Sequence, residues 1–560
     1  MCGIFIYLAR KGKTPDLEKL LAIARQQRHR GPDYEGWYVQ PKVVQVHHRL
    51  AIIDPAGGKQ PLIGTHGALA VNGEIYNHSH LKANVEPFCD YKHYRTGSDC
   101  EVILPACEGS LDKLPYALRA LEGMFAFCYW DEKREQAIVA CDPIGIIPLY
   151  YGLDDDSGDI YVASEMKAIP ASAKVNVVPP GCFAVLKDGN VDLTRMWYPY
   201  KWEKIPKKWS DPESLFEMLE SQVVSHLQSD VPWGLLLSGG LDSSIIAGLA
   251  CRHAARRVES DEMEEAWWPR VHTFSCGLKG SPDLAAARLV ATALKTVHHE
   301  KIFTVEEAIA ALPKVIRHIE TYDTTTIRAS TPMVLLAELV HSIGIKMVLS
   351  GEGADEIFGG YLYFAKAPDA EKFRRETVEK VKGLHRFDCL RANKSMMAYA
   401  VETRVPFLST PFVEYAMTLD PKLKMCGEGK IEKHILRETF ADIGLPEEVV
   451  WRQKEQFSDG VGYNWIDGVK KHAAVLYPNF DPEEAKEEYH INPPRTAEEL
   501  LYRRIFDSEF PGKSRAKTVP WGASIACSTE RAIAWDESFA NRADPSGRAV
   551  GHHEHAVPEK

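Results

Sequence analysis

One stretch, residues 235–244, constrains the fold of this chain more than any other. It reads L-L-L-S-G-G-L-D-S-S, an apolar run, two glycines and then the start of a helical pattern. Glycines let the backbone approach a ligand, and the N–H groups of such a turn form a nest for an anion. The usual phosphate loop needs a lysine after its glycines, and none follows here. A turn of this kind alone is often only a turn, but strand, S-G-G-x-D-S and helix in that order are fairly specific.

Length and composition limit the classes of protein to consider. At 560 residues the chain is too long for one core and predicts two or three domains. The net charge of -11 argues against nucleic-acid binding, and no apolar run approaches the length of a membrane span. The 12 cysteines include no C-x-x-C pair, which indicates a reducing compartment and no structural zinc site. We therefore expect a cytoplasmic enzyme without a nucleic-acid or membrane partner.

Cys2 follows the initiator, so removal of Met1 would place the α-amine of Cys2 beside its own thiol. The amine titrates near ~8 and the thiol near ~8.5, so the amine can serve as a base for the thiol at neutral pH. For this residue alone, an ordinary strand cysteine is the simpler interpretation. Four further motifs outweigh it: R-H-R-G-P-D (28–33), H-R-L-A-I-I-D (48–54), N-G-E-I-Y-N (72–77) and T-G-S-D (96–99).

Together with C-G-I at the start, these motifs resemble the glutamine amidotransferases with an N-terminal nucleophile. The resemblance implies an α+β domain of two stacked antiparallel sheets between helices. It also implies that Cys2 attacks glutamine, releases ammonia and leaves a γ-glutamyl thioester, with Asn72 and Gly73 as the oxyanion hole. The residues implied to bind glutamine are Arg49 through the α-carboxylate, Glu74 and Asp99 through the α-ammonium, and Leu50, Ala51, Ile52, Ile53, Asn72 and Gly73.

From about residue 210 onward, strand-like and helical segments alternate. The expected strands 271–276, 298–303 and 345–349 are separated by helical spans, which predicts an α/β domain with a mainly parallel sheet. Ligands of such domains lie at the carboxyl ends of the strands, where the loop 238–244, Cys276 and the run from Ser350 all fall. The predicted division is a first domain over 2–192, a linker over 193–209, a second domain over 210–515 and a partly disordered extension over 516–560.

The S-G-G-L-D-S-S run resembles the loop of the ATP pyrophosphatases, which hold the leaving pyrophosphate and transfer AMP to a carboxylate. Three later motifs extend the likeness: E-T-Y-D-T-T-T-I-R-A-S (320–330), S-G-E-G-A-D-E (350–356) and E-T-R-V-P-F-L (402–408). With W-R-Q-K-E-Q-F-S-D-G (451–460) and the amidotransferase motifs, nearly the whole chain resembles the glutamine-hydrolysing asparagine synthetases. The resemblance implies that L-aspartate, L-glutamine, ATP and water give L-asparagine, L-glutamate, AMP and diphosphate through β-aspartyl-AMP. It also implies a homodimer.

The same resemblance assigns the residues of the second site. Glu352 would be needed to form the adenylate, and Asp242 would help to hold the cofactor, a Mg²⁺ ion that bridges the phosphates. Thr325 and Arg328, in a segment expected to be a loop, would bind aspartate. The residues assigned to ATP are Leu236, Ser238, Gly239, Gly240, Asp242, Ser243, Cys276, Ser350, Gly351 and Lys454.

Two alternatives stay open from the sequence. An AMP-forming amidotransferase for a different carboxylate would keep both loops and change the segment around Thr325 and Arg328. A noncatalytic protein on the same scaffold is hard to reconcile with the joint presence of Cys2, Asn72, Asp242 and Glu352.

Overall fold

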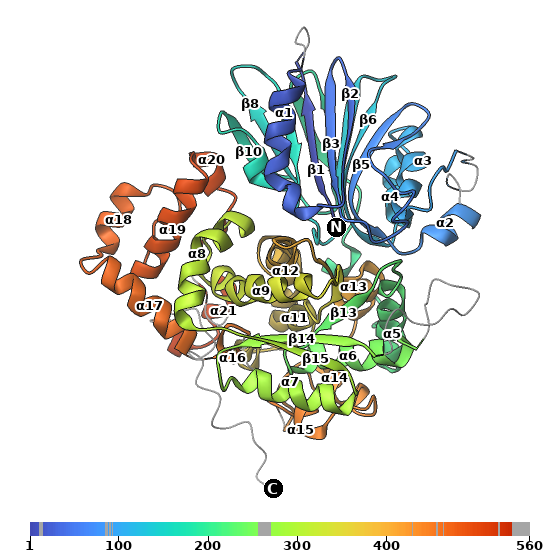
Figure 1. Cartoon of the computed structure of the whole chain (residues 1–560). Helices are drawn as coiled ribbons and strands as arrows, with labels where there is room; N and C mark the ends of the chain where they lie inside the picture. Colours follow the sequence, from blue (N-terminus) through green and yellow to red (C-terminus); the bar gives the residue numbers. More distant parts are fainter. Residues whose placement is uncertain are drawn as a thin grey trace.

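A computed structural model describes the chain except for residues 11–14, 85–87, 89–90, 92, 256–269, 428, 455–456, 463, 523, 525–526 and 540–560. Two domains lie one above the other in Figure 1, the first made of upright strands and the second of a sheet surrounded by helices. The amino terminus lies between the two domains (Figure 1).

Two antiparallel six-stranded sheets form the first domain, with the orders β10-β8-β9-β1-β3-β2 and β12-β11-β7-β6-β5-β4. The strands are β1 (Gly3–Leu8), β2 (Tyr34–Gln40), β3 (Val43–Arg49), β4 (Leu62–Ile63), β5 (Gly67–Ile75), β6 (Gly123–Asp131), β7 (Gln136–Cys141), β8 (Tyr150–Asp154), β9 (Ile160–Ala163), β10 (Ala173–Val177), β11 (Cys182–Lys187) and β12 (Asn190–Met196). The helices are α1 (Leu17–Ala24), α2 (His78–Asn84), α3 (Ile103–Glu108) and α4 (Leu114–Ala120).

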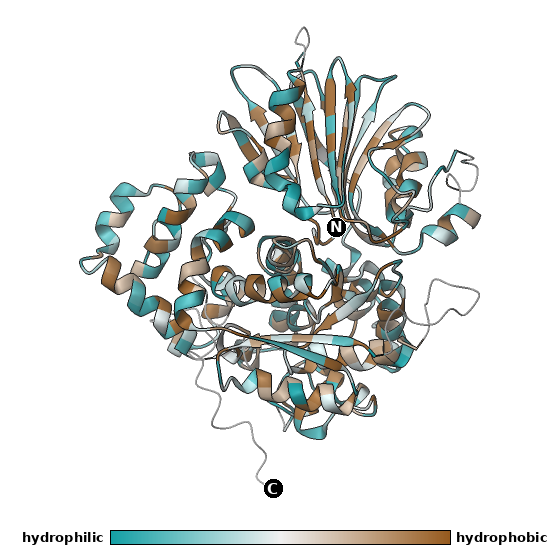
Figure 2. Cartoon of the chain, in the orientation of Figure 1, coloured by the Kyte–Doolittle hydropathy of each residue, from teal (hydrophilic) through white to brown (hydrophobic). Residues whose placement is uncertain are grey.

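Strand β1 shows how the layers are built. Its side chains alternate between faces, as a strand requires. Ile4 and Ile6 enter the core shared with the second sheet, whereas Phe5 and Tyr7 pack in the cluster that contains α1. Apolar residues accordingly concentrate along the strands in Figure 2. The predicted fold class, two stacked antiparallel sheets between helices, is confirmed.

A five-stranded sheet with the order β15-β14-β13-β16-β17 forms the centre of the second domain, and all its pairings are parallel, as predicted. Its strands are β13 (Trp233–Leu236), β14 (His272–Gly277), β15 (Val297–Ile302), β16 (Met347–Leu349) and β17 (Glu402–Arg404). The helices around it are α5 (Leu215–His226), α6 (Leu241–His253), α7 (Pro282–Ala293), α8 (Val305–Ile319), α9 (Thr324–Ser342), α10 (Ala354–Phe358), α11 (Ala370–Gly383), α12 (Asp388–Met397), α13 (Thr410–Ala416), α14 (His434–Thr439), α15 (Glu447–Val450) and α16 (Phe457–Gly460).

The sequence predicts a loop over 320–330, and this is wrong from Thr324 onward, where α9 begins. Asp323 is the residue before the helix, and its side chain accepts a hydrogen bond from the backbone N–H of Thr326 at 2.9 Å. Three consecutive threonines are weak helix formers. The aspartate cap and the burial of the helix outweigh that preference.

The connection between the domains is more ordered than the predicted linker. Strand β12 continues past the predicted boundary at 192 to Met196. Beyond it, Trp197, Tyr198, Tyr200 and Trp202 are buried, and each ring meets the next edge to face. We call residues 197–202 the aromatic connector.

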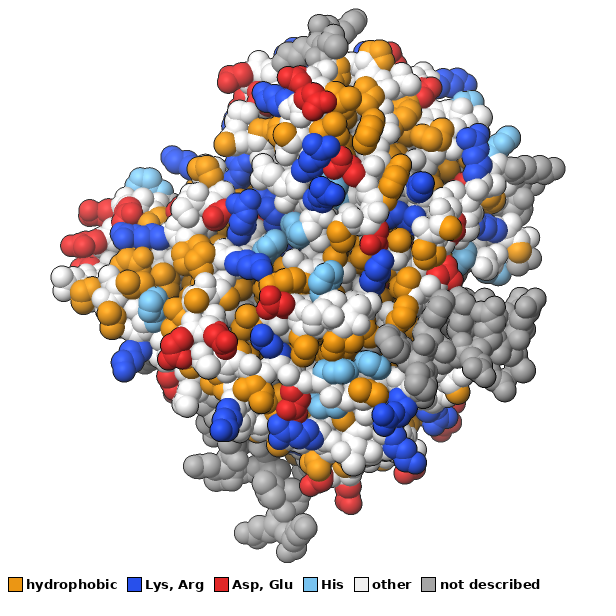
Figure 3. Space-filling model, in the orientation of Figure 1, with side chains coloured by type: hydrophobic (Ala, Val, Ile, Leu, Met, Phe, Trp, Pro, Cys, Tyr) orange, Lys and Arg blue, Asp and Glu red, His pale blue; other side chains and the backbone are white. Residues whose placement is uncertain are grey.

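The carboxyl-terminal part adds α17 (Asn464–Leu476), α18 (Pro482–Glu488), α19 (Ala497–Glu509), α20 (Lys513–Ala516) and α21 (Glu530–Ile533). In the predicted extension, Ala532 and Phe539 are buried in a cluster with Tyr361 and Phe373. Residues 540–560 lie outside the described part of the chain. In the described part, no helix is both long and apolar enough to cross a membrane. Positive and negative side chains are intermixed on the face shown in Figure 3.

Candidate active sites

The first candidate site lies directly before β1, where Cys2 is buried. The backbone N–H of Cys2 donates to Oδ1 of Asn72 at 2.6 Å, and its Sγ lies 3.8 Å from the carbonyl oxygen of Leu50. Burial raises the pKa of the Cys2 thiol. The thiol is therefore protonated at neutral pH and needs a base to become a nucleophile.

Asn72 and Gly73 follow one another on β5, beside Cys2. Because Oδ1 of Asn72 accepts from Cys2, its Nδ2 is the remaining polar group, and it is buried without a hydrogen-bond partner among the described residues. Gly73 has a φ of 145°, and a Cβ there would lie 2.0 Å from the carbonyl oxygen of Met124, so the position requires glycine. An unpaired buried donor is costly unless a ligand uses it. The pair fits the predicted oxyanion hole.

The loop predicted to bind glutamine wraps around the side chain of Arg49. Its guanidinium donates to the carbonyl oxygens of residues 53–55 at 2.6 to 3.1 Å. The backbone N–H of Ala51 donates to Asp33 at 2.8 Å, which fixes the other end of the loop. A glutamine carboxylate would therefore have to share Arg49 with the loop carbonyls. The buried members of the loop are Leu50, Ala51 and Ile52, and Ile53 is half-buried.

Glu74 and Asp99, predicted to hold the α-ammonium group of glutamine, are buried near the same place. Asp99 accepts the backbone N–H of Ile75 at 2.6 Å, which fixes its carboxylate. Burial, followed by the nearby carboxylates of Glu402 and Asp99, raises the pKa of Glu74. An ammonium ligand would offset this repulsion. Glu402 belongs to the second domain, and no motif in the sequence linked it to this site.

Met1 fills part of the interface between the domains. Its ammonium group forms a buried ion pair with the carboxylate of Glu402. While Met1 is present, the nitrogen of Cys2 belongs to a peptide bond and is no base. The amine base expected from the sequence therefore requires removal of Met1.

The second candidate site is a pocket of about 380 Å³ at the carboxyl ends of β13, β14 and β16. Every residue predicted for ATP except Gly239 lines it, and so do Glu352 and Thr325. Gly239 packs closely against α7: a Cβ at this position would lie 2.5 Å from the backbone nitrogen of Ala287. The loop therefore packs its glycine on α7 and presents its other residues to the pocket.

The loop before α6 has the features of an anion nest. Gly239 adopts a φ of 77°, which glycine reaches without strain. The hydroxyl of Ser243 accepts the backbone N–H of Ser238 at 3.2 Å, and that of Ser244 donates to the carbonyl oxygen of Gly240 at 2.8 Å. These bonds fix the turn at the positive amino-terminal end of α6, where a phosphate is favoured.

Two carboxylates and two ammonium groups alternate along the pocket wall. Nζ of Lys433 donates to Asp242 at 2.6 Å and to Asp355 at 2.8 Å, and Nζ of Lys454 lies 2.5 Å from Asp355. Burial would raise the pKa of Asp355, but the two lysines lower it overall. The sequence assigned Asp242 and Lys454 to this site and missed Lys433 and Asp355. Lys433 stands in no recognisable motif, whereas Asp355 could have been found from its place in S-G-E-G-A-D-E.

The predicted Mg²⁺ fits Asp242 and Asp355. Both carboxylates already converge on one cation, the ammonium group of Lys433, so they can share a positive charge. Carboxylate and phosphate oxygens are the ligands that Mg²⁺ prefers. Among the described residues, no group of three or more histidine, cysteine or acidic side chains forms a metal site. The phosphates of ATP would thus have to supply further ligands.

Glu352 lines the pocket and is held by Arg391 of α12. Arg391 donates to Glu352 at 2.6 Å and pairs with Asp388 at 2.7 Å. Burial raises the pKa of Glu352 although Arg391 opposes the shift. A carboxylate that is both fixed and raised in pKa can exchange a proton with a bound substrate. Arg391 carried no sequence signal.

The assignment of Arg328 to aspartate binding remains a prediction. Arg328 does not line the pocket, because Glu498 of α19 holds its guanidinium in a buried two-pronged ion pair. The two contacts are Nε to Oε1 at 2.8 Å and Nη2 to Oε2 at 2.6 Å. Thr325 does line the pocket, and its hydroxyl donates to Asp323 at 2.8 Å.

Other pocket residues were not assigned to the site from the sequence. Asp323 lies in the motif predicted to bind aspartate, whereas Lys380 and Asp388, and Trp521, Cys527 and Thr529 from the predicted extension, come from segments that the sequence did not connect with the site. The residues from the extension show that the carboxyl-terminal segment forms one wall of the pocket.

A cysteine site on stacked antiparallel sheets, joined to a phosphate-loop pocket on a parallel sheet, defines a two-domain amidotransferase synthetase. Residues 1–191 match the glutamine amidotransferase domain family, and residues 214–371 and 365–524 match the asparagine synthase family. The chain belongs to the family of the glutamine-hydrolysing asparagine synthetases.

Two relatives illustrate how far the similarity extends. The chain is 51% identical over 563 residues to asparagine synthetase B [glutamine-hydrolyzing] of Escherichia coli (strain K12), covering 99% of this chain and 100% of that protein. It is 47% identical over 571 residues to asparagine synthetase [glutamine-hydrolyzing] of Asparagus officinalis, covering 99% of this chain and 94% of that protein.

Proposed function

We propose that this chain makes L-asparagine from L-aspartate, with L-glutamine as the nitrogen donor and ATP as the activating substrate. The observation that carries the proposal is the pairing of two sites in one chain. The buried, unpaired amide of Asn72 beside Cys2 suits glutamine hydrolysis, and Glu352 in the phosphate-loop pocket suits activation of a carboxylate. The relatives that match over the full length are asparagine synthetases, which supports this pairing and gives no support to a different carboxylate substrate.

In the first half-reaction, the α-amine of Cys2, freed by removal of Met1, takes the thiol proton as the sulfur attacks the amide carbon of glutamine. Nδ2 of Asn72 donates to the oxyanion of the tetrahedral intermediate. The intermediate collapses, ammonia leaves with the proton from the amine, and a γ-glutamyl thioester remains. Water then attacks the thioester, which releases glutamate and restores the thiol.

In the second half-reaction, a side-chain carboxylate oxygen of aspartate attacks the α-phosphorus of ATP. The bond to the bridging oxygen breaks, and pyrophosphate leaves into the loop before α6, where Lys454 and the helix terminus balance its charge. At this step the carboxylate of Glu352, fixed by Arg391, exchanges a proton with the bound substrate. Asp242 and Asp355 would hold Mg²⁺, which would supply further charge neutralisation at the phosphates. Ammonia then attacks the acyl carbon of β-aspartyl-AMP, AMP leaves, and a proton passes to solvent.

The remaining parts of the proposal concern the whole molecule. The homodimer rests on the resemblance to the family, and the cytoplasmic location on the cysteine pattern and that resemblance. We also propose that the first domain extends to Met196 and that the second domain includes the packed tail as far as residue 539.

The test is mass spectrometry of the products formed from aspartate, ATP, magnesium and amide-labelled glutamine. We expect labelled asparagine together with AMP and pyrophosphate. Cys2→Ala should lose synthesis from glutamine and keep synthesis from added ammonia, because the second site uses nothing from the thiol. Asparagine without label, or loss of both activities in a folded Cys2→Ala protein, would overturn the proposal.

A further inference from the structure

A residue of the second domain touches a glutamine-binding residue of the first. Nη2 of Arg404, on β17, lies 3.3 Å from Oε2 of Glu74, and both side chains are buried. Arg404 is fixed by Glu402, which accepts from its Nε at 2.7 Å, and by the carbonyl oxygen of Gln228, which accepts from Nη1 at 2.6 Å. Nη2 itself has no hydrogen-bond partner among the described residues. The carboxylate of Glu74 therefore lies beside a cation that the second domain holds in place.

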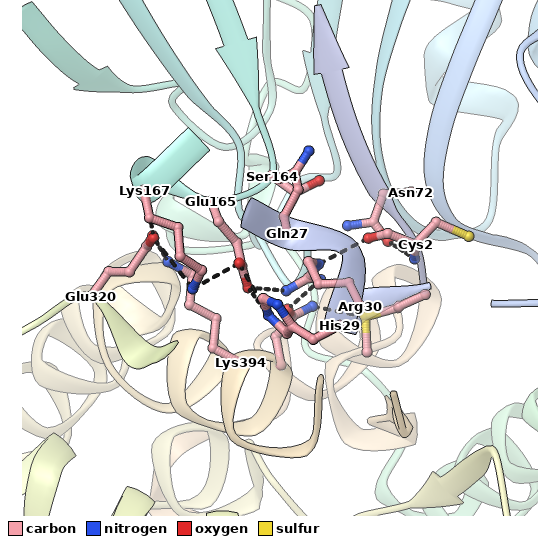
Figure 4. Close-up of polar contacts among 12 residues, drawn as sticks. Cys2, Gln27, His29, Arg30, Asn72, Ser164, Glu165, Lys167, Glu320 and Lys394 are labelled. Atoms are coloured by element: carbon pink, nitrogen blue, oxygen red, sulfur yellow. Dashed lines mark hydrogen bonds and ion pairs between the residues drawn. The ribbon is translucent and has the colours of Figure 1, made fainter. Parts of the chain in front are cut away.

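A second contact of this kind reaches Cys2 through Arg30, a fully buried residue. Nε of Arg30 donates to the carbonyl oxygen of Cys2 at 2.9 Å, and Nη1 donates to Glu165 at 3.1 Å. Nη2 donates to Oδ1 of Asn393, on α12 of the second domain, at 2.9 Å. Figure 4 shows Arg30 between Cys2 and Glu165, directly above the helix that carries Lys394.

The contact between the domains is fixed by further buried charges at the same place. Glu320 of the second domain accepts the backbone N–H groups of Met166 and Lys167 at 2.7 and 2.8 Å. Lys394 donates to Glu320 at 2.5 Å, and Lys167 pairs with Glu165 at 2.8 Å (Figure 4). A buried network in which the charges are paired holds one geometry, because breaking a single contact leaves an uncompensated charge.

We propose that the second domain supplies two positioning residues for glutamine hydrolysis: Asn393, which acts on Cys2 through Arg30, and Arg404, which acts through Glu74. The inference rests on the proposed function of Cys2. By this proposal the cysteine site is complete only when both domains are docked. Asn393 sets the orientation of the nucleophile, so it affects the chemical step. Arg404 sets the carboxylate that receives the α-ammonium group of glutamine, so it affects binding.

Asn393 is tested by two substitutions, of which only one keeps an acceptor for Arg30. Asn393→Leu removes the acceptor for Arg30, and Asn393→Asp keeps it. We expect Asn393→Leu to lower kcat for glutamate release from glutamine by about tenfold, since small misplacements of a nucleophile are costly. Asn393→Asp should recover most of this loss. Unchanged glutamate release in Asn393→Leu, or an equal loss in both variants, would overturn the role.

Arg404 is tested with Arg404→Lys, which keeps the charge and loses the planar fork. We expect KM for glutamine in glutamate release to rise by about tenfold, with kcat less affected, because the change acts on substrate binding. A normal KM for glutamine would overturn the role.

Ammonia-dependent asparagine synthesis is measured in every variant, and we expect it to stay within about twofold of the parent because the second site remains folded. Glu414→Gln serves as a control, since it alters the 2.6 Å contact between Glu414 and Tyr198, which joins the second domain to the aromatic connector. An equal fall of both activities, or the same effect in Glu414→Gln, would show a merely structural role and overturn the inference. If the parent releases no glutamate and Cys2→Ala changes nothing, the proposed function itself has failed, which is a distinguishable result.

Discussion

Asn72 uses only one of its two polar side-chain atoms within the protein: Oδ1 accepts the N–H of Cys2 at 2.6 Å, whereas Nδ2 has no partner among the described residues. Asn72→Asp keeps the acceptor and removes the donor. We expect both Asn72→Asp and Asn72→Ala to lower kcat for glutamate release about a hundredfold, as loss of an oxyanion donor does. Ammonia-dependent synthesis should be unaffected in both. Near-normal glutamate release by Asn72→Asp would contradict the donor role.

Glu352 is expected to be required for adenylate formation and dispensable for glutamine hydrolysis. Glu352→Gln keeps the size of the side chain and removes its charge and basicity. Aspartate-dependent pyrophosphate release should fall about a hundredfold or more, since the substitution removes the carboxylate that is proposed to exchange a proton at this step. Arg391 retains Asp388 at 2.7 Å, so the fold should survive. Glutamate release by the same preparation is the internal control, and normal pyrophosphate release would refute the role.

The carboxyl-terminal segment that forms one wall of the pocket is held in place by helix α11. Glu376 accepts from the backbone N–H and the hydroxyl of Thr529 at 3.0 and 2.6 Å, and Lys380 donates to the carbonyl oxygen of Cys527 at 2.7 Å. Thr529→Val removes the hydroxyl bond alone. We expect KM for aspartate to rise about fivefold, the effect of one lost hydrogen bond, with a smaller change for ATP. Glu537→Gln, an exposed substitution in the same segment, is the control and should leave both KM values unchanged. Unchanged KM values in Thr529→Val would contradict a role of this segment in substrate binding.

Lys424 offers a test of stability against pH. Its Nζ is buried and donates to the carbonyl oxygens of Ile357 and Ala416. Burial, followed by the charge of Arg374, lowers the pKa of Lys424 to about 7. An unfolded chain keeps the ordinary lysine value of ~10.5 and binds a proton that the folded protein lacks between these two values. The contribution of Lys424 to stability is therefore greatest above ~10.5 and is lost as the pH falls toward about 7.

Lys424→Met removes this titration. Relative to the parent, the variant should become more stable as the pH falls from about 10 to about 7, by at most about 4 kcal/mol in the free energy of unfolding. Thermal midpoints of both proteins across that range measure the effect. Lys422→Met, an exposed neighbour, is the control and should follow the parent. A constant difference between Lys424→Met and the parent would contradict the depressed pKa.

Features that depend on neighbouring residues were predictable from the sequence. The apolar run, the glycines and the following helix at 235–244 appear as β13, a tight turn and α6. The strand predicted over 271–276 is β14, one residue displaced at each end. The parallel sheet then brings Ser238, Cys276 and Glu352 to one pocket. Local pattern and sheet topology were enough to place these groups.

Features that depend on distant partners were not predictable. Arg328 was assigned to aspartate because it shares a segment with several hydroxyl side chains, whereas Glu498, with which it forms an ion pair, comes from α19. Lys433 and Arg391 could be recognised as site residues only from the structure, which places them beside Asp242 and Glu352, respectively. A single sequence shows which charges exist, but the pairing of charges far apart in the chain is decided by tertiary structure.

The aromatic connector has a consequence for protein engineering. Trp197 and Trp202 are almost completely buried, and the rings between them are packed against one another. A cut or a flexible insertion in this segment would expose large apolar rings to water, at a cost of several kcal/mol, about 1.5–3 for each large side chain. Chimeras that exchange the amidotransferase half between synthetases would therefore have to keep residues 197–202 with the matching surface of both halves. In this enzyme the aromatic connector is a rigid, buried link, so the two halves are poor candidates for interchangeable modules.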